Sequence, residues 1–172
     1  MNVNLNPAQS PSEGSATKLA YNRLRDLILT GDLAPGEKLK IDRLRDLLGT
    51  GASPIREALS LLVSDQLVVR HEQRGFRAAE TSRENFQEIL TLRCALESMA
   101  LGHSMENATD EWVENLVVVH HRMTRLQAER SDAFEREHKH FHMALIGNCQ
   151  SPLLLRFCDQ LYDLNIRYRY LA

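Results

Sequence analysis

The segment Ser53–Ser64 constrains the fold more than any other, because it combines a helix start with an apolar stripe. Pro54 suits the first helical position, where its missing N–H costs nothing, and Ser53 is expected to cap the free amides with its hydroxyl. Apolar residues at i, i+3, i+4 and i+7 predict one buried helix face. These residues are Ile55, Ala58, Leu59 and Leu62.

The opposite face of this segment carries Arg56, Glu57 and Ser60, so Arg56 is expected to point outward from the first turn. A helix that enters the major groove of DNA by its N-terminal end places such a side chain against a guanine. The guanidinium fork matches the O6 and N7 acceptors of that base. A solvated helix charge explains Arg56 equally well from this segment alone, and the flanking sequence has to decide.

The residues before this segment favour a helix-turn-helix. Thr17–Thr30 has a helical apolar stripe and ends at Gly31, and Asp32–Gly36 has the Pro-Gly pair of a type II turn. A short extended piece at Lys38–Lys40 leads into a second helix at Ile41–Leu48, whose expected inward residues are Ile41, Leu44, Leu47 and Leu48. Two helices joined by a glycine-bearing turn are typical of DNA-binding domains.

The residues after the segment predict a β-hairpin. Leu67–Arg70 and Phe76–Ala79 have the composition of strands, and the turn between them carries Arg74 beside Gly75. Such a hairpin is a wing, a basic finger that reaches a phosphate or an adjacent minor groove. Taken in isolation, Arg74 is better explained as a solvated hairpin arginine.

Charge and cysteine content set limits on the function. Residues 1–79 carry 11 Lys and Arg against 9 Asp and Glu, whereas the remainder carries 10 against 14, a mild asymmetry that favours a nucleic-acid-binding first half. No apolar run is long enough to span a membrane, and Met1–Gly14 lacks the pattern of a signal peptide. Three cysteines without a C-x-x-C pair fit reduced thiols in the cytoplasm, and we expect them in the core. The cysteines are Cys94, Cys149 and Cys158.

The segments Gly31–Leu39, Ser53–Leu59, Leu67–Val68 and Arg74–Phe76 resemble, in order and spacing, the winged helix of the GntR family of bacterial transcription regulators. The resemblance implies a homodimer on a short inverted repeat of double-stranded DNA, with Arg56 as the base-contacting arginine of the R-E-A-L motif. Many members have a further arginine where this chain has Ala52, so Lys40, Arg43 and Arg45 are the expected phosphate contacts in its place. The full expected DNA-contacting set is Arg56, Ser53, Arg45, Arg43, Lys40, Ser60, Arg74 and Gly75.

The second half is helical by its apolar period. The expected helices are Ser82–Met105, Asp110–Glu129, Asp132–Asn148 and Pro152–Leu171, the last burying Leu153, Leu154, Phe157, Leu161 and Leu164. No Gly/Pro linker divides them, so they form one bundle. The predicted fold is therefore mainly α, with a flexible tail at 1–15, a winged helix-turn-helix at 16–79 and an all-α bundle at 82–172.

His138 and His142 fall on one face of the third of these helices, while His140 projects elsewhere. Residues four apart rise about 6 Å along a helix, a spacing at which two imidazoles can share one divalent metal. Two ligands do not make a site, and core histidines bonded to backbone or carboxylate are the better explanation from the spacing alone.

Leu92-Arg93 with Leu96-Glu97, His138-x-x-Phe141-His142 and Asn148 resemble the FCD effector domain of the FadR-type GntR subclass. The resemblance implies a divalent metal on His138 and His142, with Arg93 binding the effector. Many such domains have Asp or Asn where this chain has His138, and a histidine there favours zinc or nickel. Without the resemblance, Arg93 is better explained as the i+4 partner of Glu97.

The chain departs from this subclass near its end. The subclass supplies two further histidines from later helices, and no histidine follows His142 here. The expectation is a truncated product or fragment, or a bundle completed by a partner chain. His103, His120 and His121 are alternative ligands that nothing in the family supports.

The function expected from the sequence is a cytoplasmic bacterial repressor, not an enzyme, that responds to a small carboxylate metabolite. One alternative is a DNA-binding and dimerisation fragment without an effector response. A metal-dependent hydrolase is disfavoured, because Lys139 and His140 follow His138 where a zinc protease motif needs H-E-x-x-H.

Overall fold

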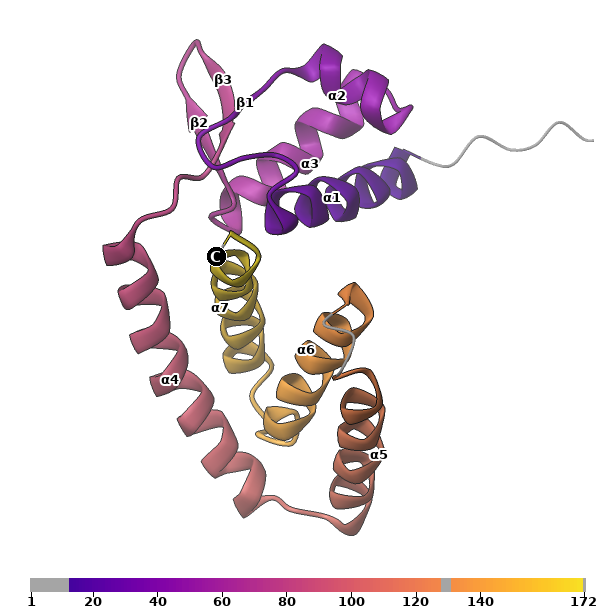
Figure 1. The fold of residues 1–172 in the computed structure, drawn as a ribbon, viewed down its shortest axis with the longest axis vertical. Coiled ribbons are helices and arrows are strands. Elements are labelled where there is room, and N and C mark those ends of the chain that lie inside the picture. Colours follow the sequence, from indigo (N-terminus) through magenta and orange to yellow (C-terminus); the bar gives the residue numbers. More distant parts are fainter. Residues whose placement is uncertain (1–12, 128–130, 172) are drawn as a thin grey trace, which may run out of the picture. The chain divides into compact units, whose positions relative to one another are not determined.

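The computed structural model describes residues 13–127 and 131–171. The predicted tail at 1–15 lies largely outside this range, as does Glu129, the predicted end of one helix. The described residues form seven helices and a three-stranded sheet (Figure 1). The chain divides into two compact units, Met1–Thr81 with Tyr170–Ala172 and Ser82–Arg169.

The first unit is a winged helix-turn-helix, as predicted. Its elements are α1 (Glu13–Thr30), β1 (Lys38–Leu39), α2 (Ile41–Leu48), α3 (Ala52–Ser64), β2 (Val68–His71) and β3 (Gly75–Ala78). All four residues of the α3 stripe are fully buried, together with Leu24 and Ile28 of α1. The apolar period of Ser53–Ser64 therefore predicted the buried face of α3. On α2 only Leu44 is buried, and Leu47 is 52% exposed, because the core reaches this short helix at one point.

The start of α3 differs from the prediction. The helix begins at Ala52, and Gly51 is the N-cap residue in an extended conformation, without a side-chain capping hydrogen bond. Ser53 therefore lies inside the first turn and does not cap the helix, so the capping prediction was wrong. Pro54 is still accommodated, because the N–H groups of the first turn need no partner within the helix.

The sheet has the order β1-β3-β2, with both pairs antiparallel. The predicted extended piece at Lys38–Lys40 thus becomes an edge strand. The type II turn before it forms as expected, since the Glu37 N–H donates to the Ala34 carbonyl at 3.0 Å and Gly36 has φ +73°. The sheet lies against α3, with which β2 is in contact (Figure 1).

The second unit consists of α4 (Arg83–Glu106), α5 (Asp110–Leu126), α6 (Asp132–Ile146) and α7 (Pro152–Leu171). Hydroxyl side chains cap all four of these helices at their N-termini: Ser82, Thr109, Ser131 and Ser151 each accept from the N–H three residues later. The core contains Ala100, Ile146, Cys149 and Cys158. Among the described residues, no helix is both long and apolar enough to cross a membrane.

Two predictions about this core were wrong. Cys94 is exposed on α4. On α7, Leu153 and Phe157 are 56% and 48% exposed, whereas Leu164 is buried as predicted. Every residue from Tyr162 to Arg167 is buried, so this part of α7 is buried on all sides and has no single buried stripe. Tyr162 is hydrogen-bonded to His138 of α6, and Asn165 accepts from Arg93 of α4, so these polar side chains of α7 are held inside the bundle.

Candidate functional site

Helix α3 presents Arg56 on its exposed face, where the sequence predicted it. Within the described residues, the Arg56 guanidinium has no hydrogen-bond or ion-pair partner. The Ser60 hydroxyl donates to the Arg56 carbonyl at 2.9 Å, so it is directed back onto its own helix. Ser53 is exposed on the first turn of α3. Arg56 is therefore the α3 side chain best placed to contact a base.

The basic residues around α2 are exposed and paired only at the surface. Arg43 contacts the Glu37 carboxylate, and Arg45 Nη1 lies 3.6 Å from Asp42 Oδ1. Lys40 is exposed immediately before α2. Exposed ion pairs of this kind contribute little stability, so a DNA phosphate can replace the carboxylate partner at small cost.

The wing adds further basic residues. Arg74 is exposed at its tip, and Gly75 has φ +85°, a backbone conformation that favours glycine. Lys38 and Arg77 are directly opposite each other in the β1–β3 register and both are exposed. Lys38 and Arg77 were not among the predicted DNA contacts, because the pairing of β1 with β3 could not be inferred from a two-residue strand.

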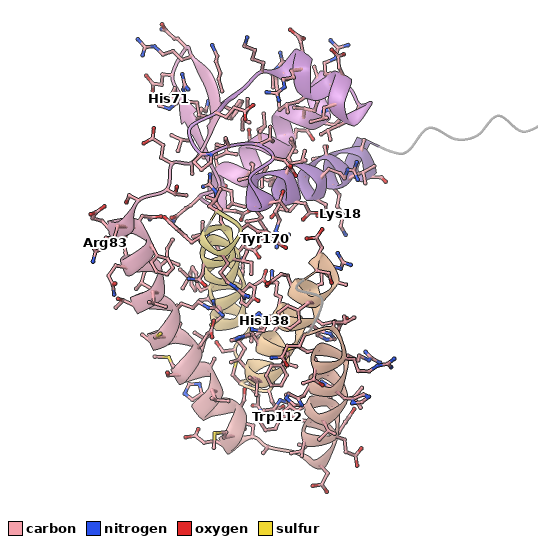
Figure 2. The ribbon with its side chains drawn as sticks, in the orientation of Figure 1. Lys18, His71, Arg83, Trp112, His138 and Tyr170 are labelled. Carbon is pink, nitrogen blue, oxygen red and sulfur yellow. The ribbon has the colours of Figure 1, made fainter. Side chains whose placement is uncertain are left out.

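The second unit brings together six polar side chains from α4, α6 and α7, which we call the polar cluster. Its members are Arg93, Glu97, His138, His142, Tyr162 and Asn165. The His138 and His142 rings lie with centroids 4.7 Å apart in an edge-to-face arrangement. Figure 2 shows His138 in the region between α6 and α7. The structure therefore places the two predicted histidines and Arg93 in one site.

His138 is held by neighbours on three sides. The Tyr162 Oη and Arg169 Nη1 each lie 3.0 Å from His138 Nδ1, and Phe134 stacks on the ring with centroids 5.5 Å apart. Burial, together with the positive charges of His142, Arg169 and Arg93, lowers the pKa of His138 to about 4. The imidazole is therefore neutral at pH 7.

Arg93 links all three helices of the polar cluster. Its Nε pairs with Glu97, its Nη1 donates to Asn165 Oδ1 at 2.7 Å, and its guanidinium carbon lies 4.4 Å from the centre of the Tyr162 ring. Burial alone would raise the pKa of Glu97, but hydrogen bonds from His142 and Arg93 outweigh it and lower that pKa. The ion pair between Arg93 and Glu97, which the sequence offered as one explanation of Arg93, is therefore present.

The two histidines of the polar cluster would supply part of the ligand set of a metal ion. Among residues 13–127 and 131–171, no three His, Cys, Asp or Glu side chains come together as a set that could hold one. Arginine only donates, so the contact with Arg169 makes His138 Nδ1 an acceptor and leaves the ring proton on Nε2. In this arrangement the histidines act as hydrogen-bonding groups.

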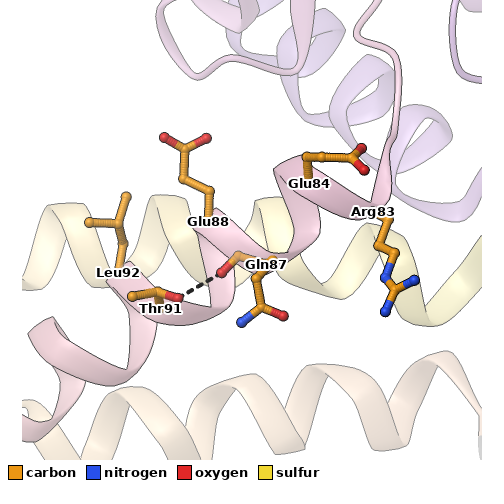
Figure 3. Close-up of a pocket in the computed structure, with 6 residues that line it drawn as sticks. All are labelled: Arg83, Glu84, Gln87, Glu88, Thr91 and Leu92. Atoms are coloured by element: carbon orange, nitrogen blue, oxygen red, sulfur yellow. Dashed lines mark hydrogen bonds between the residues drawn. The ribbon is translucent and has the colours of Figure 1, made fainter.

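Two other features lie apart from these sites. Asn148, part of the motif noted in the sequence, donates through Nδ2 to the carbonyls of Ser104 and Asn107 and so joins the ends of α4 and α6. A shallow hollow runs along α4, lined by residues of that helix alone (Figure 3). None of the predicted site residues lines this hollow.

Comparison with known proteins identifies both halves. Residues 16–77 match the model of bacterial regulatory proteins of the gntR family, and residues 88–172 match the FCD domain. The HTH-type transcriptional repressor GlaR of Escherichia coli strain K12 is 32% identical over 156 residues, which cover 88% of this chain and 71% of GlaR. The HTH-type transcriptional regulator BphR of Paraburkholderia xenovorans strain LB400 is 34% identical, covering 92% of this chain and 67% of BphR.

Solved structures agree with this comparison. The structure of McbR/YncC from E. coli superimposes with a TM-score of 0.74 at 27% sequence identity, covering 92% of this chain and 76% of McbR. A transcriptional regulator from Rhodococcus sp. RHA1, at 22% identity and a TM-score of 0.68, shares the fold.

Proposed function

Since the chain belongs to the GntR family of bacterial regulatory proteins and carries an FCD domain, it is a DNA-binding transcription regulator, and we propose that a small carboxylate controls it as a repressor. Residues 16–79 bind operator DNA, and residues 82–172 bind the effector and a second copy of the chain. The protein acts in the cytoplasm, where the operator lies.

The guanidinium of Arg56 on α3, which is exposed and has no partner among residues 13–127 and 131–171, is the observation that carries the DNA-binding assignment. The remaining contacts are those expected from the sequence: Ser53 and Ser60 on α3, Lys40, Arg43 and Arg45 around α2, and Arg74 with Gly75 on the wing. Arginine and lysine at these positions neutralise phosphates and fix the register of the protein on the duplex, whereas Arg56 contacts a base.

The homodimer is supported by apolar side chains that the second unit leaves exposed. Met99 and Met105 on α4 and Val113 and Val117 on α5 are each about half exposed or more. A second copy of the chain that packs on α4 and α5 would bury these side chains. Two copies related by a two-fold axis require an operator with two inverted half-sites.

Selection of bound duplexes from a random DNA library tests this assignment. We expect enrichment of a short inverted repeat that binds two copies of the chain, with affinity that falls steeply as salt rises. Binding that shows no sequence preference at any salt concentration would contradict the operator assignment.

The polar cluster is the proposed effector site, with Arg93 pairing the effector carboxylate. Its guanidinium already pairs with one carboxylate, that of Glu97, and arginine is well suited to bind a carboxylate. A ligand that binds two dimer geometries with different affinity shifts their populations, and with them the affinity for the operator.

Removing the wing arginine should weaken binding without changing specificity. In Arg74→Ala we expect a similar loss on every duplex and a salt slope smaller in magnitude by about 1, because one phosphate contact is lost. The measurement is the dissociation constant over a series of salt concentrations. Arg156→Ala, which removes an exposed arginine of α7, is the matched control and should leave the slope unchanged. A change in base preference in Arg74→Ala would assign Arg74 to base contact instead.

The expectation of zinc or nickel on His138 and His142 follows from the FCD domain, and thermal unfolding tests it. Metal binding to the folded chain must raise the melting temperature. We expect zinc or nickel to stabilise the wild type, small carboxylates to add to this only with metal present, and His142→Ala to lose both effects. His140→Ala removes a neighbouring exposed histidine and should behave as the wild type. Equal stabilisation of His142→Ala and the wild type would exclude His142 as a ligand.

A further inference from the structure

Two hydrogen bonds join α1 to the recognition helix α3 within the first unit. The Thr17 hydroxyl donates to Glu57 Oε2 at 2.7 Å, and the Tyr21 hydroxyl donates to Asp65 Oδ2 at 2.7 Å. Thr17 is 9% exposed, so its hydroxyl has little access to water. All four residues line a groove between the two helices.

The two bonds differ in where they hold α3. Glu57 follows Arg56 directly in the sequence, within the first turns of the helix, whereas Asp65 is the residue that ends it. The stripe of Ile55, Ala58, Leu59 and Leu62 buries α3, but apolar contacts have no direction and permit small rotations. A hydrogen bond to a charged acceptor is stronger and directional, so the Thr17–Glu57 bond fixes the rotation of α3 where Arg56 projects.

The negative charge of Glu57 is a second reason why its direction matters for DNA binding. A carboxylate beside the base-contacting residue would face the phosphates of bound DNA unless something directs it elsewhere. The hydroxyl of Thr17 holds it toward α1, on the flank of α3. A bidentate arginine contact tolerates errors of only about 0.5 Å and 10–20°.

We propose that Glu57, held by Thr17, is a positioning residue that sets the direction of Arg56 and thereby the base preference of the protein. This inference rests on the proposed role of Arg56 in operator binding. It assigns to the second residue of the Arg56-Glu57-Ala58-Leu59 segment a function beyond helix packing.

The test measures the affinity of each variant for two duplexes. One is the duplex selected by the wild type, and the other is the same duplex with the base pair contacted by Arg56 changed. Thr17→Val has nearly the same shape as the wild type but lacks the donor, and we expect the ratio of the two affinities to fall about tenfold. Thr17→Ser keeps the hydroxyl and should retain the ratio. Glu57→Gln keeps an acceptor oxygen and should retain it, whereas Glu57→Ala should lose it.

Tyr21→Phe is the matched control, because it removes the other hydroxyl bond between the same two helices. We expect it to lower the melting temperature about as much as Thr17→Val while leaving the affinity ratio unchanged. Melting curves of every variant show whether the unit is folded at the binding temperature. The proposal is overturned if Thr17→Val and Glu57→Ala keep the wild-type ratio, or if Tyr21→Phe loses it equally. Failure to select any duplex would instead refute the proposed function itself.

Discussion

Arg56→Ala should lose about 1–3 kcal/mol of operator affinity, roughly 5- to 150-fold, and relax the base preference at one position of each half-site. The loss is largest on the operator, because a duplex without the contacted guanine never engages the guanidinium fork. Dissociation constants on the selected duplex and on single-base variants of it measure both effects.

Two further variants separate the contributions of Arg56. Arg56→Lys keeps the charge but not the fork, so it should retain binding to unrelated duplexes and still lose the base preference. Arg23→Ala removes an exposed arginine of α1 and is the matched control, expected to match the wild type on every duplex. If Arg56→Ala bound the operator with unchanged affinity and preference, α3 would not be the recognition helix.

Arg93→Met should lower the free energy of unfolding of the helical unit by about 3 kcal/mol. The side chains of Arg93 and Glu97 are only 13% and 22% exposed, so the substitution leaves a largely buried carboxylate without its cation. Asn165 loses its donor and the Tyr162 ring loses the stacked guanidinium at the same time. Chemical denaturation followed by circular dichroism measures the change.

The double variant Arg93→Met with Glu97→Leu distinguishes the structural and ligand-binding roles of Arg93. Replacing both charges by apolar groups should recover most of the stability, because no buried charge remains unpaired. We expect this folded double variant to show no stabilisation by carboxylates. A double variant that is stable and still responds to the effector would show that Arg93 is structural only.

Much of the first unit could be predicted from the sequence, because its signals are local. The apolar period of α3, the Pro35-Gly36 turn and the hairpin around Gly75 each depend on residues within one turn or one helix. The error at Ser53 was local as well: Gly51, two residues earlier, already occupied the N-cap position.

The candidate site residues of the second unit could also be predicted from the sequence. The spacing of His138 and His142 places them on one helix face whatever surrounds that helix. The same spacing does not predict which residues of α7 contact these two histidines. An apolar count favours Leu153 and Phe157 as buried residues of α7, yet both are exposed, whereas Tyr162 and Asn165 are buried and hydrogen-bonded to α6 and α4.

The sequence by itself thus determined the helices and the winged helix-turn-helix, since these follow from short-range periodicity and turn chemistry. It also determined which charged and histidine side chains share a helix face. The tertiary structure alone decided how they are paired. Thr17 meets Glu57 across 40 residues and Arg93 meets Asn165 across 72, and hydrogen bonds between such distant residues depend on how helices rotate and pack. Packing of that kind is a property of the whole core, which no local pattern encodes.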